Sequence, residues 1–233
     1  MGVRSVISVV LAAVVFAATF GAAAGADRAR PSTADQATAN RDVLRLDDLP
    51  TTVTWKATRY SSKSSGTPAS CSRLDSPGAS VVDTADAASQ FAAPGILAMN
   101  MVGLVATSHM LDVAWQHTFG SSPAACLRDA FAQGSAGHLK IIDSSALALP
   151  KVAPRQQAYR MVFTMNVHGV TEYGAFDMVA MGGGRTMSLL FTGGLIGPAS
   201  ERSTGEAAMS LIDLRIAQIL AGRAFKGTSG LTA

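Results

Sequence analysis

An alternation of apolar and polar residues in the second half of the chain constrains the fold more than any other feature. Residues 156–168 place apolar side chains on one face and polar side chains on the other, which is the pattern of a half-buried strand. Residues 170–181 and 187–191 repeat the pattern after the turn signals Gly169 and GGGR at 182–185. Strands joined by such short turns pair antiparallel, so the sequence predicts a three-strand meander.

The rest of the chain adds one strand and several helices. Residues 96–106 are nearly all apolar, which predicts a central strand covered on both faces. Val81 and Val82 are expected to form a short strand, and residues 83–93 one or two helical turns. Two helices are expected between Ser108 and Gly134, with a break at 120–123.

A long helix is expected at the C-terminal end, starting at a capping box formed by STGE at 203–206. Its apolar residues leave a narrow polar side at Glu206, Ser210 and Asp213, so most of the helix is expected to pack on the sheet. The predicted fold class is therefore α+β: an antiparallel β-sheet with a meander, packed against helices that include this long C-terminal helix.

The N-terminus carries the pattern of an export signal. Arg4 precedes an apolar run over 5–20, and small residues at 21–26 suit signal peptidase. Residues 1–26 are therefore interpreted as a signal peptide, with an uncleaved membrane anchor as the alternative. The expected location is secreted or in the cell envelope, with membrane contact only through this segment if it is retained.

Three further segments complete the expected organisation. Residues 27–42 are polar and contain Pro and Ser without a period, so they are predicted to be a flexible tether. A single domain is expected over 43–226, opening with a short helical segment before Pro50. Residues 227–233 begin with Gly227, the expected helix stop, and are expected to fray.

The chain has two cysteines. In an oxidising compartment two cysteines favour a disulfide between Cys71 and Cys126, which would close a loop of about 55 residues. The alternative makes Cys126 a nucleophile, because a helix N-terminus lowers the pKa of a thiol. That role also requires a base, and no histidine is placed near it in the sequence.

Charge and motifs exclude several classes of function. A net charge of +3 with 15% charged residues is too mild for a nucleic-acid partner. The chain has no G-x-S-x-G, H-E-x-x-H or C-x-x-C motif, so we predict neither an enzyme nor a cofactor. His109 and Asp112 have the helical spacing of two metal ligands, but exposed polar residues on an amphipathic helix explain them equally well, and no metal site is predicted.

Two surfaces are candidates for ligand binding. The polar face of the meander offers a small polar ligand five side chains, although an ordinary solvent-facing surface with cross-strand pairs is the alternative. The many methionines offer instead a pliable pocket for a lipid-like ligand, with simple core packing as the alternative. The five candidate side chains of the polar face are Arg160, Asn166, His168, Tyr173 and Asp177.

Several short motifs together resemble the exported sensor-like domains of actinobacteria, exemplified by the extracellular sensor domain of PknH-type kinases and by LpqN-type lipoproteins. The resemblance spans residues 43–225. It implies a PsbP-like sandwich of an antiparallel sheet and helices that binds ligands or partners without catalysis. The chain departs from these relatives in having cysteines for one disulfide, where the kinase domain has two, and in lacking a lipobox cysteine. The motifs are LRLDDLP at 44–50, Trp55, Cys71, the Trp115 helix leading to CLRDAF, AYRMVF at 158–163, GGGRTMSLLF at 182–191 and the terminal helix.

These observations predict a secreted, non-catalytic cell-envelope module. It is expected to bind a small ligand, lipid-like or glycan, or an envelope protein in a cleft between sheet and helices. One alternative is an extracellular hydrolase without a recognisable motif, using His168, Asp177 and Glu172. The other is a purely structural or antigenic envelope protein with no pocket.

Overall fold

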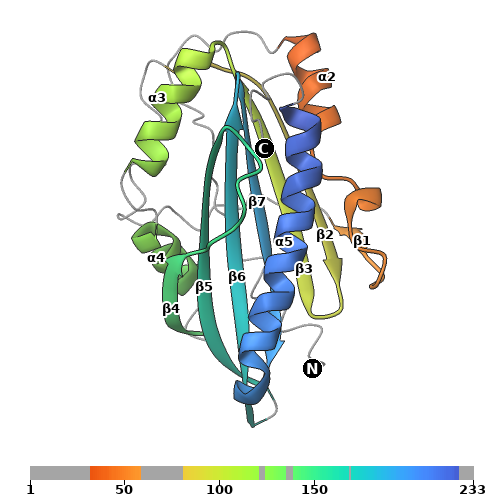
Figure 1. The fold of residues 1–233 in the computed structure, drawn as a ribbon, viewed down its shortest axis with the longest axis vertical. Helices are drawn as coiled ribbons and strands as arrows, with labels where there is room; N and C mark the ends of the chain where they lie inside the picture. Colours follow the sequence, from red (N-terminus) through yellow and green to blue (C-terminus); the bar gives the residue numbers. More distant parts are fainter. Residues whose placement is uncertain (1–31, 59–80, 121–123, 135–138, 168, 226–233) are drawn as a thin grey trace.

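The computed structural model describes residues 32–58, 81–120, 124–134, 139–167 and 169–225 (Figure 1). Within these residues, seven strands form one sheet in the order β1-β2-β3-β7-β6-β5-β4, and every neighbouring pair is antiparallel. Helices lie on both faces of the sheet. The predicted α+β fold with a long C-terminal helix is confirmed. The strands are β1 Lys56–Thr58, β2 Asp83–Ala93, β3 Ile96–Val105, β4 Lys140–Ala146, β5 Arg155–Val167, β6 Val170–Gly183 and β7 Thr186–Gly197; the helices are α2 Thr33–Asp42, α3 Ser108–Phe119, α4 Ala124–Gly134 and α5 Arg202–Ala224, with short 3₁₀ helices η1 Leu46–Asp48 and η3 Ala199–Glu201.

The predicted meander is formed by β5, β6 and β7. Gly169 and Gly184 have φ of 85° and 57° in the two turns, a left-handed conformation that glycine adopts without strain. The period of two divides the side chains as predicted. Met161 and Phe163 enter one core with α3 and α4, whereas Ala158 enters the other with α5.

The central strand β3 lies between β2 and β7, as the apolar run predicted. Its partner β2 corrects the sequence prediction, because residues 83–93 form a strand and not helical turns. Ala, Asp and Ser give this segment little intrinsic preference for a strand. Pairing with β3 along its whole length, and burial of Ala85 and Phe91, override that preference.

The predicted flexible tether over 27–42 is wrong for most of its length, because residues 33–42 form α2. The Ser32 hydroxyl caps this helix by accepting a hydrogen bond from the Asp35 amide at 3.3 Å. Ala39 is fully buried against β2 and β3. The folded part therefore includes α2, while the predicted signal peptide (1–26) and frayed end (227–233) lie outside the described residues.

Helix α5 starts differently from the prediction. It continues from η3 and begins at Arg202, with Glu201 as an N-cap that makes no side-chain cap. Ser203 therefore lies inside the first turn, and the predicted capping box is wrong. Glu206 instead pairs with Arg202 one turn earlier, at 2.7 Å.

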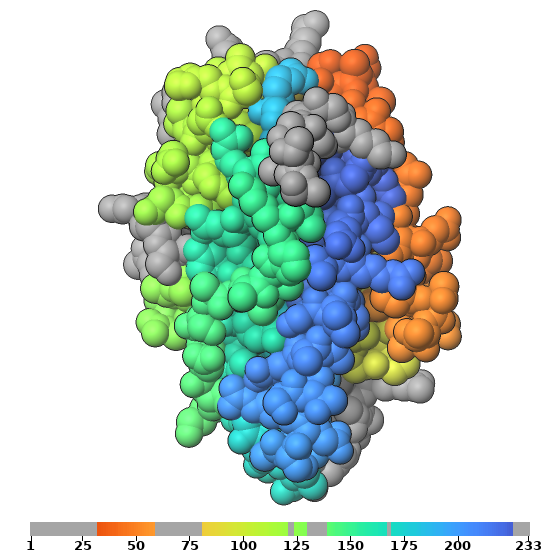
Figure 2. Space-filling view, viewed as in Figure 1, coloured from red at the N-terminus to blue at the C-terminus, as the bar shows by residue number. Residues whose placement is uncertain are grey.

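The orientation of α5 also differs from what its sequence suggested. Leu211 is 69% exposed, whereas the polar Asp213 is fully buried on the side that faces the sheet. The narrow polar side is therefore the side that docks. Figures 1 and 2 show α5 as a continuous blue ridge along the front of the sheet.

Candidate functional site

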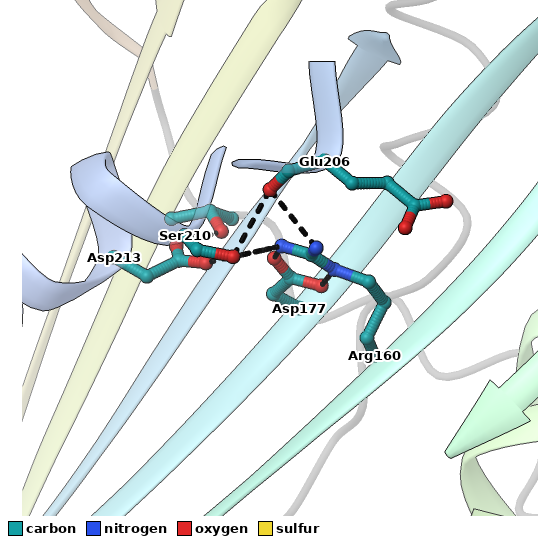
Figure 3. A network of polar contacts seen from close by, with 6 residues as sticks. Arg160, Asp177, Glu206, Ser210 and Asp213 are labelled. Carbon is teal, nitrogen blue, oxygen red and sulfur yellow. Dashed lines mark hydrogen bonds and ion pairs between the residues drawn. The ribbon is translucent and has the colours of Figure 1, made fainter. Parts of the chain in front are cut away.

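A row of polar side chains crosses the sheet beneath α5. Arg160 on β5 stands opposite Asp177 on β6, and Asp177 stands opposite Thr192 on β7. The alternation along each strand turns all three toward α5, where Thr192 bonds to Asp213. Figure 3 shows Ser210 and Asp213 of α5 beside Arg160 and Asp177. We call Arg160, Asp177, Thr192, Ser210 and Asp213 the polar cluster.

Arg160 is only 7% exposed, and its guanidinium group forms hydrogen bonds with three residues. Its Nε and Nη2 donate to the two carboxylate oxygens of Asp177, at 2.7 and 2.5 Å. Nη1 donates to the backbone carbonyl of Glu206 at 2.9 Å, and Nη2 also reaches the Ser210 hydroxyl at 3.1 Å. Burial by itself lowers the pKa of Arg160, but the hydrogen bond and charge of Asp177, with the charges of Asp213 and Glu206, outweigh it and raise the pKa.

Asp213 brings a second carboxyl group into the cluster. Its Oδ1 accepts a hydrogen bond from the Thr192 hydroxyl, while its Oδ2 lies 3.9 Å from Arg160 Nη2. Burial, followed by the hydrogen bond and charge of Asp177, raises the pKa of Asp213 well above its ordinary value of 3.8, against the opposing effects of Thr192 and Arg160.

The cluster is a sealed clamp. Asp177 and Asp213 have no exposed surface, and Arg160 and Thr192 are also buried. Arg160 bonds to Asp177 on β6 and to Glu206 and Ser210 on α5. Thr192 on β7 bonds to Asp213 on α5. The geometry therefore joins α5 to three strands and leaves these groups inaccessible to a substrate.

Of the five predicted ligand-binding residues, the four that the structure describes do not converge on one cleft. Arg160 and Asp177 are brought together, but as partners of each other. Tyr173 lies further along β6, half-buried beneath the guanidinium of Arg202 at 5.6 Å from its ring centroid. Asn166 is exposed at the β5–β6 turn, where its Oδ1 accepts a hydrogen bond from the Gly169 amide at 2.8 Å. His168 lies outside the described residues.

Ser210 and Asp213 were missed as partners of Arg160, and Thr192 was missed as a partner of Asp213. The sequence did contain a signal, because a narrow polar side on a mostly apolar helix needs polar groups opposite it if it is buried. The alternation on β5 and β6 supplied such groups. Nothing in the pattern indicated that the helix crosses the sheet at that level.

The structure also bears on the candidate metal ligands, the cysteines and the membrane segment. Asp112 on α3 forms an ion pair with Arg155, and no group of three or more potential metal ligands occurs among the described residues. Cys126 is 3% exposed in α4, while Cys71 lies outside the described residues, so the disulfide stays a prediction. No helix in the described part of the chain is long and apolar enough to span a bilayer.

The opposite face of the sheet has a different composition. Seven of the ten methionines lie in the layer between the sheet and helices α3 and α4. Aromatic side chains from the sheet and from α3 lie in the same layer. We call this the methionine layer. Trp115 of α3 lies against Gly182 so closely that a Cβ there would meet its ring at 3.0 Å. Its methionines are Met99, Met101, Met110, Met161, Met165, Met178 and Met187, and its aromatic residues include Trp115, Phe119, Phe163, Phe176 and Phe191.

A scan against protein-family models and a search of curated proteins each found no match to this chain.

Proposed function

We propose that the chain is an exported, non-catalytic module of the cell envelope that binds an apolar, lipid-like ligand in the methionine layer. The observation that carries this proposal is the concentration of thioether and aromatic side chains on one face of the sheet. Methionine has no branch and an adaptable thioether, so it accommodates varied apolar shapes. The α5 face is packed instead mainly by Ala, Leu, Val and Ile.

The polar cluster supports an apolar ligand over a polar one. Arg160 and Asp177 were the charged groups expected to recognise a small polar ligand, and they are bound to each other beneath α5. The hydrolase alternative needs Asp177 as an acid–base group, yet this carboxylate has no exposed surface. Both observations favour a binding module whose ligand contacts are apolar.

The two tryptophans allow a direct test, because they lie on opposite faces of the sheet. Trp115 belongs to the methionine layer, and Trp55 packs in the core beneath α5. Each single-tryptophan variant, Trp55→Phe or Trp115→Phe, is titrated with a dibrominated stearic acid, whose bromines quench nearby tryptophan. Unbrominated stearic acid is the control for changes in environment.

We expect saturable quenching of Trp115 in the Trp55→Phe variant and little quenching of Trp55 in the Trp115→Phe variant. Equal quenching of both residues would indicate non-specific association. Absence of saturable quenching of Trp115 would contradict an acyl-chain ligand in the methionine layer.

A further inference from the structure

The polar cluster contains two carboxyl groups and one guanidinium. Arg160 gives two hydrogen bonds to Asp177 and none to Asp213, whose Oδ2 lies 3.9 Å from Nη2. Thr192 serves only the other oxygen, Oδ1. With both acids ionised, Asp213 Oδ2 is a fully buried oxygen without a hydrogen-bond partner, which is an unfavourable state for a charged group.

A proton on Asp213 removes this conflict. Asp177 Oδ2 and Asp213 Oδ2 both lie beside Arg160 Nη2, at 2.5 and 3.9 Å, and a hydrogen bond between two carboxyl groups requires that one of them carry a proton. A protonated Asp213 has an O–H donor to direct at Asp177, still accepts a hydrogen bond from Thr192, and leaves one carboxylate opposite one guanidinium. The buried charges then balance.

Among the described residues, the other elements around Asp213 offer no second cation. Arg160 comes from β5, Asp177 from β6 and Thr192 from β7, and these are the groups that act on its titration. On α5 itself, Glu206 contributes its backbone carbonyl to Arg160, while its carboxylate bonds to Arg202. Figure 3 shows the Glu206 side chain directed away from the cluster.

We propose that Asp177 and Asp213 share one buried proton and that loss of this proton weakens the docking of α5 on the sheet, so that α5 is a pH-sensitive latch. When the proton is lost, the O–H bond of the Asp213 carboxyl group breaks, the electron pair stays on the carboxylate, and the proton passes to water. Two carboxylates then face one guanidinium in a layer closed to solvent. Repulsion between them and their loss of hydration act on the helix that carries Asp213.

The direction of the pH effect follows from the raised pKa of Asp213. A group whose pKa is higher in the folded state contributes stability that is fully present below its unfolded pKa and is lost as pH rises through the folded pKa. In that window the folded protein holds one proton more than the unfolded chain. The unfolding equilibrium constant therefore rises by about tenfold per pH unit from this group alone.

The first experiment compares urea unfolding of the wild type and Asp213→Asn from about pH 5 to about pH 9. The asparagine amide retains a donor toward Asp177 and an acceptor for Thr192 but has no proton to lose. We expect the ratio of the two unfolding constants to rise with the slope of one proton. A ratio independent of pH would overturn the proposal.

Asp83→Asn is the matched control. Burial, followed by the charge of Asp86, raises the pKa of Asp83 to about 6. This variant should therefore change the pH dependence of the unfolding constant only below that pH. Hydrogen exchange then locates the effect. Corrected for intrinsic rates, the amides of α5 should lose protection as pH rises while those of α3 keep theirs; equal behaviour of the two helices would overturn the latch.

Infrared spectroscopy of the wild type keeps the proposal testable if Asp213→Asn does not fold. At about pH 7 the carboxylic acids of Asp83 and of ordinary surface residues are mostly ionised. We expect a carbonyl band of one protonated, buried carboxyl group at that pH, which disappears reversibly as the pH is raised. Absence of this band would overturn the proposal.

Discussion

Arg160 illustrates how one charged residue is accommodated beneath α5, where most of the surrounding side chains are apolar. The strand alternation turns it toward α5, and Asp177 on the neighbouring strand meets it with both carboxylate oxygens. The remaining hydrogen bonds of Arg160 go to α5, to the Glu206 carbonyl and the Ser210 hydroxyl. Removing the cation leaves the buried carboxylate without its main partner, which is the costly way to break such a pair.

Arg160→Met should therefore destabilise the protein by about 3–5 kcal/mol, because it retains most of the side-chain volume but leaves Asp177 buried without a cation. Urea unfolding at neutral pH measures the change. Arg128→Met is the matched control, since Arg128 is 57% exposed and pairs with Asp129 at 3.5 Å on the surface; its effect should stay below about 0.5 kcal/mol. A loss below about 1 kcal/mol for Arg160→Met would contradict the clamp.

At the scale of elements, α5 packs so closely on β7 that one of its glycines has no room for a side chain. A Cβ on Gly205 would overlap the backbone carbonyl oxygen of Ile196 on β7, whereas a Cβ on Gly222 would meet nothing within 4 Å. Both residues lie in the same helix. Their substitutions therefore separate helix propensity from helix docking.

Gly205→Ala should lower stability by about 1–3 kcal/mol, because α5 or β7 must shift to make room. Gly222→Ala should raise it by about 0.5–1 kcal/mol, since alanine is the better helix former and the space is open. Both are measured by urea unfolding. A gain in stability for Gly205→Ala would show that the helix is not held against β7 at this point.

The elements also show what sequence patterns can and cannot predict. Periodicity identified β5, β6, β7 and the shared face of Arg160 and Asp177, because alternation is a local property of each strand. It misassigned β2, whose strand conformation depends on pairing with β3. It also placed Asp213 on a polar side without revealing that this side is buried, because periodicity does not say which element covers a face.

At the scale of the molecule, the two edges of the sheet are protected from pairing with other strands in different ways. Beside the short β1, helix α2 lies along β2, where the Ser32 amide and the Gln36 side chain donate to carbonyls of β2. The other edge strand, β4, carries a bulge and charged residues at Lys140 and Asp143. Covered, bulged and charged edges oppose strand addition by other chains.

Arginines distant in sequence fasten the N-terminal segment to this sheet. Arg185, in the β6–β7 turn, bonds to Asp35 of α2 at 2.5 Å. Arg223, near the end of α5, bonds to the Val43 carbonyl at 2.9 Å and pairs with Asp48. Inside, the Asn100 Oδ1 of β3 accepts from the Leu44 amide at 2.9 Å. The first described residues are therefore part of the same folded unit as the last.

The two faces of the sheet should unfold together, although their cores differ in composition. Neighbouring residues on the same strand alternate between them: Met178 belongs to the methionine layer and Val179 to the core beneath α5. Loss of either core removes packing from every second side chain of the shared strands. Unfolding is therefore expected to be a single cooperative transition.

Fluorescence in urea tests this cooperativity on both faces. In Trp55→Phe the signal comes from Trp115 in the methionine layer, and in Trp115→Phe it comes from Trp55 beneath α5. Within each variant, the fluorescence midpoint should coincide with the far-UV circular dichroism midpoint, because both cores depend on the same strands. A Trp115 transition that precedes the loss of circular dichroism would mean that α3 and α4 open as a separate layer, and the shared sheet would then not couple the two cores.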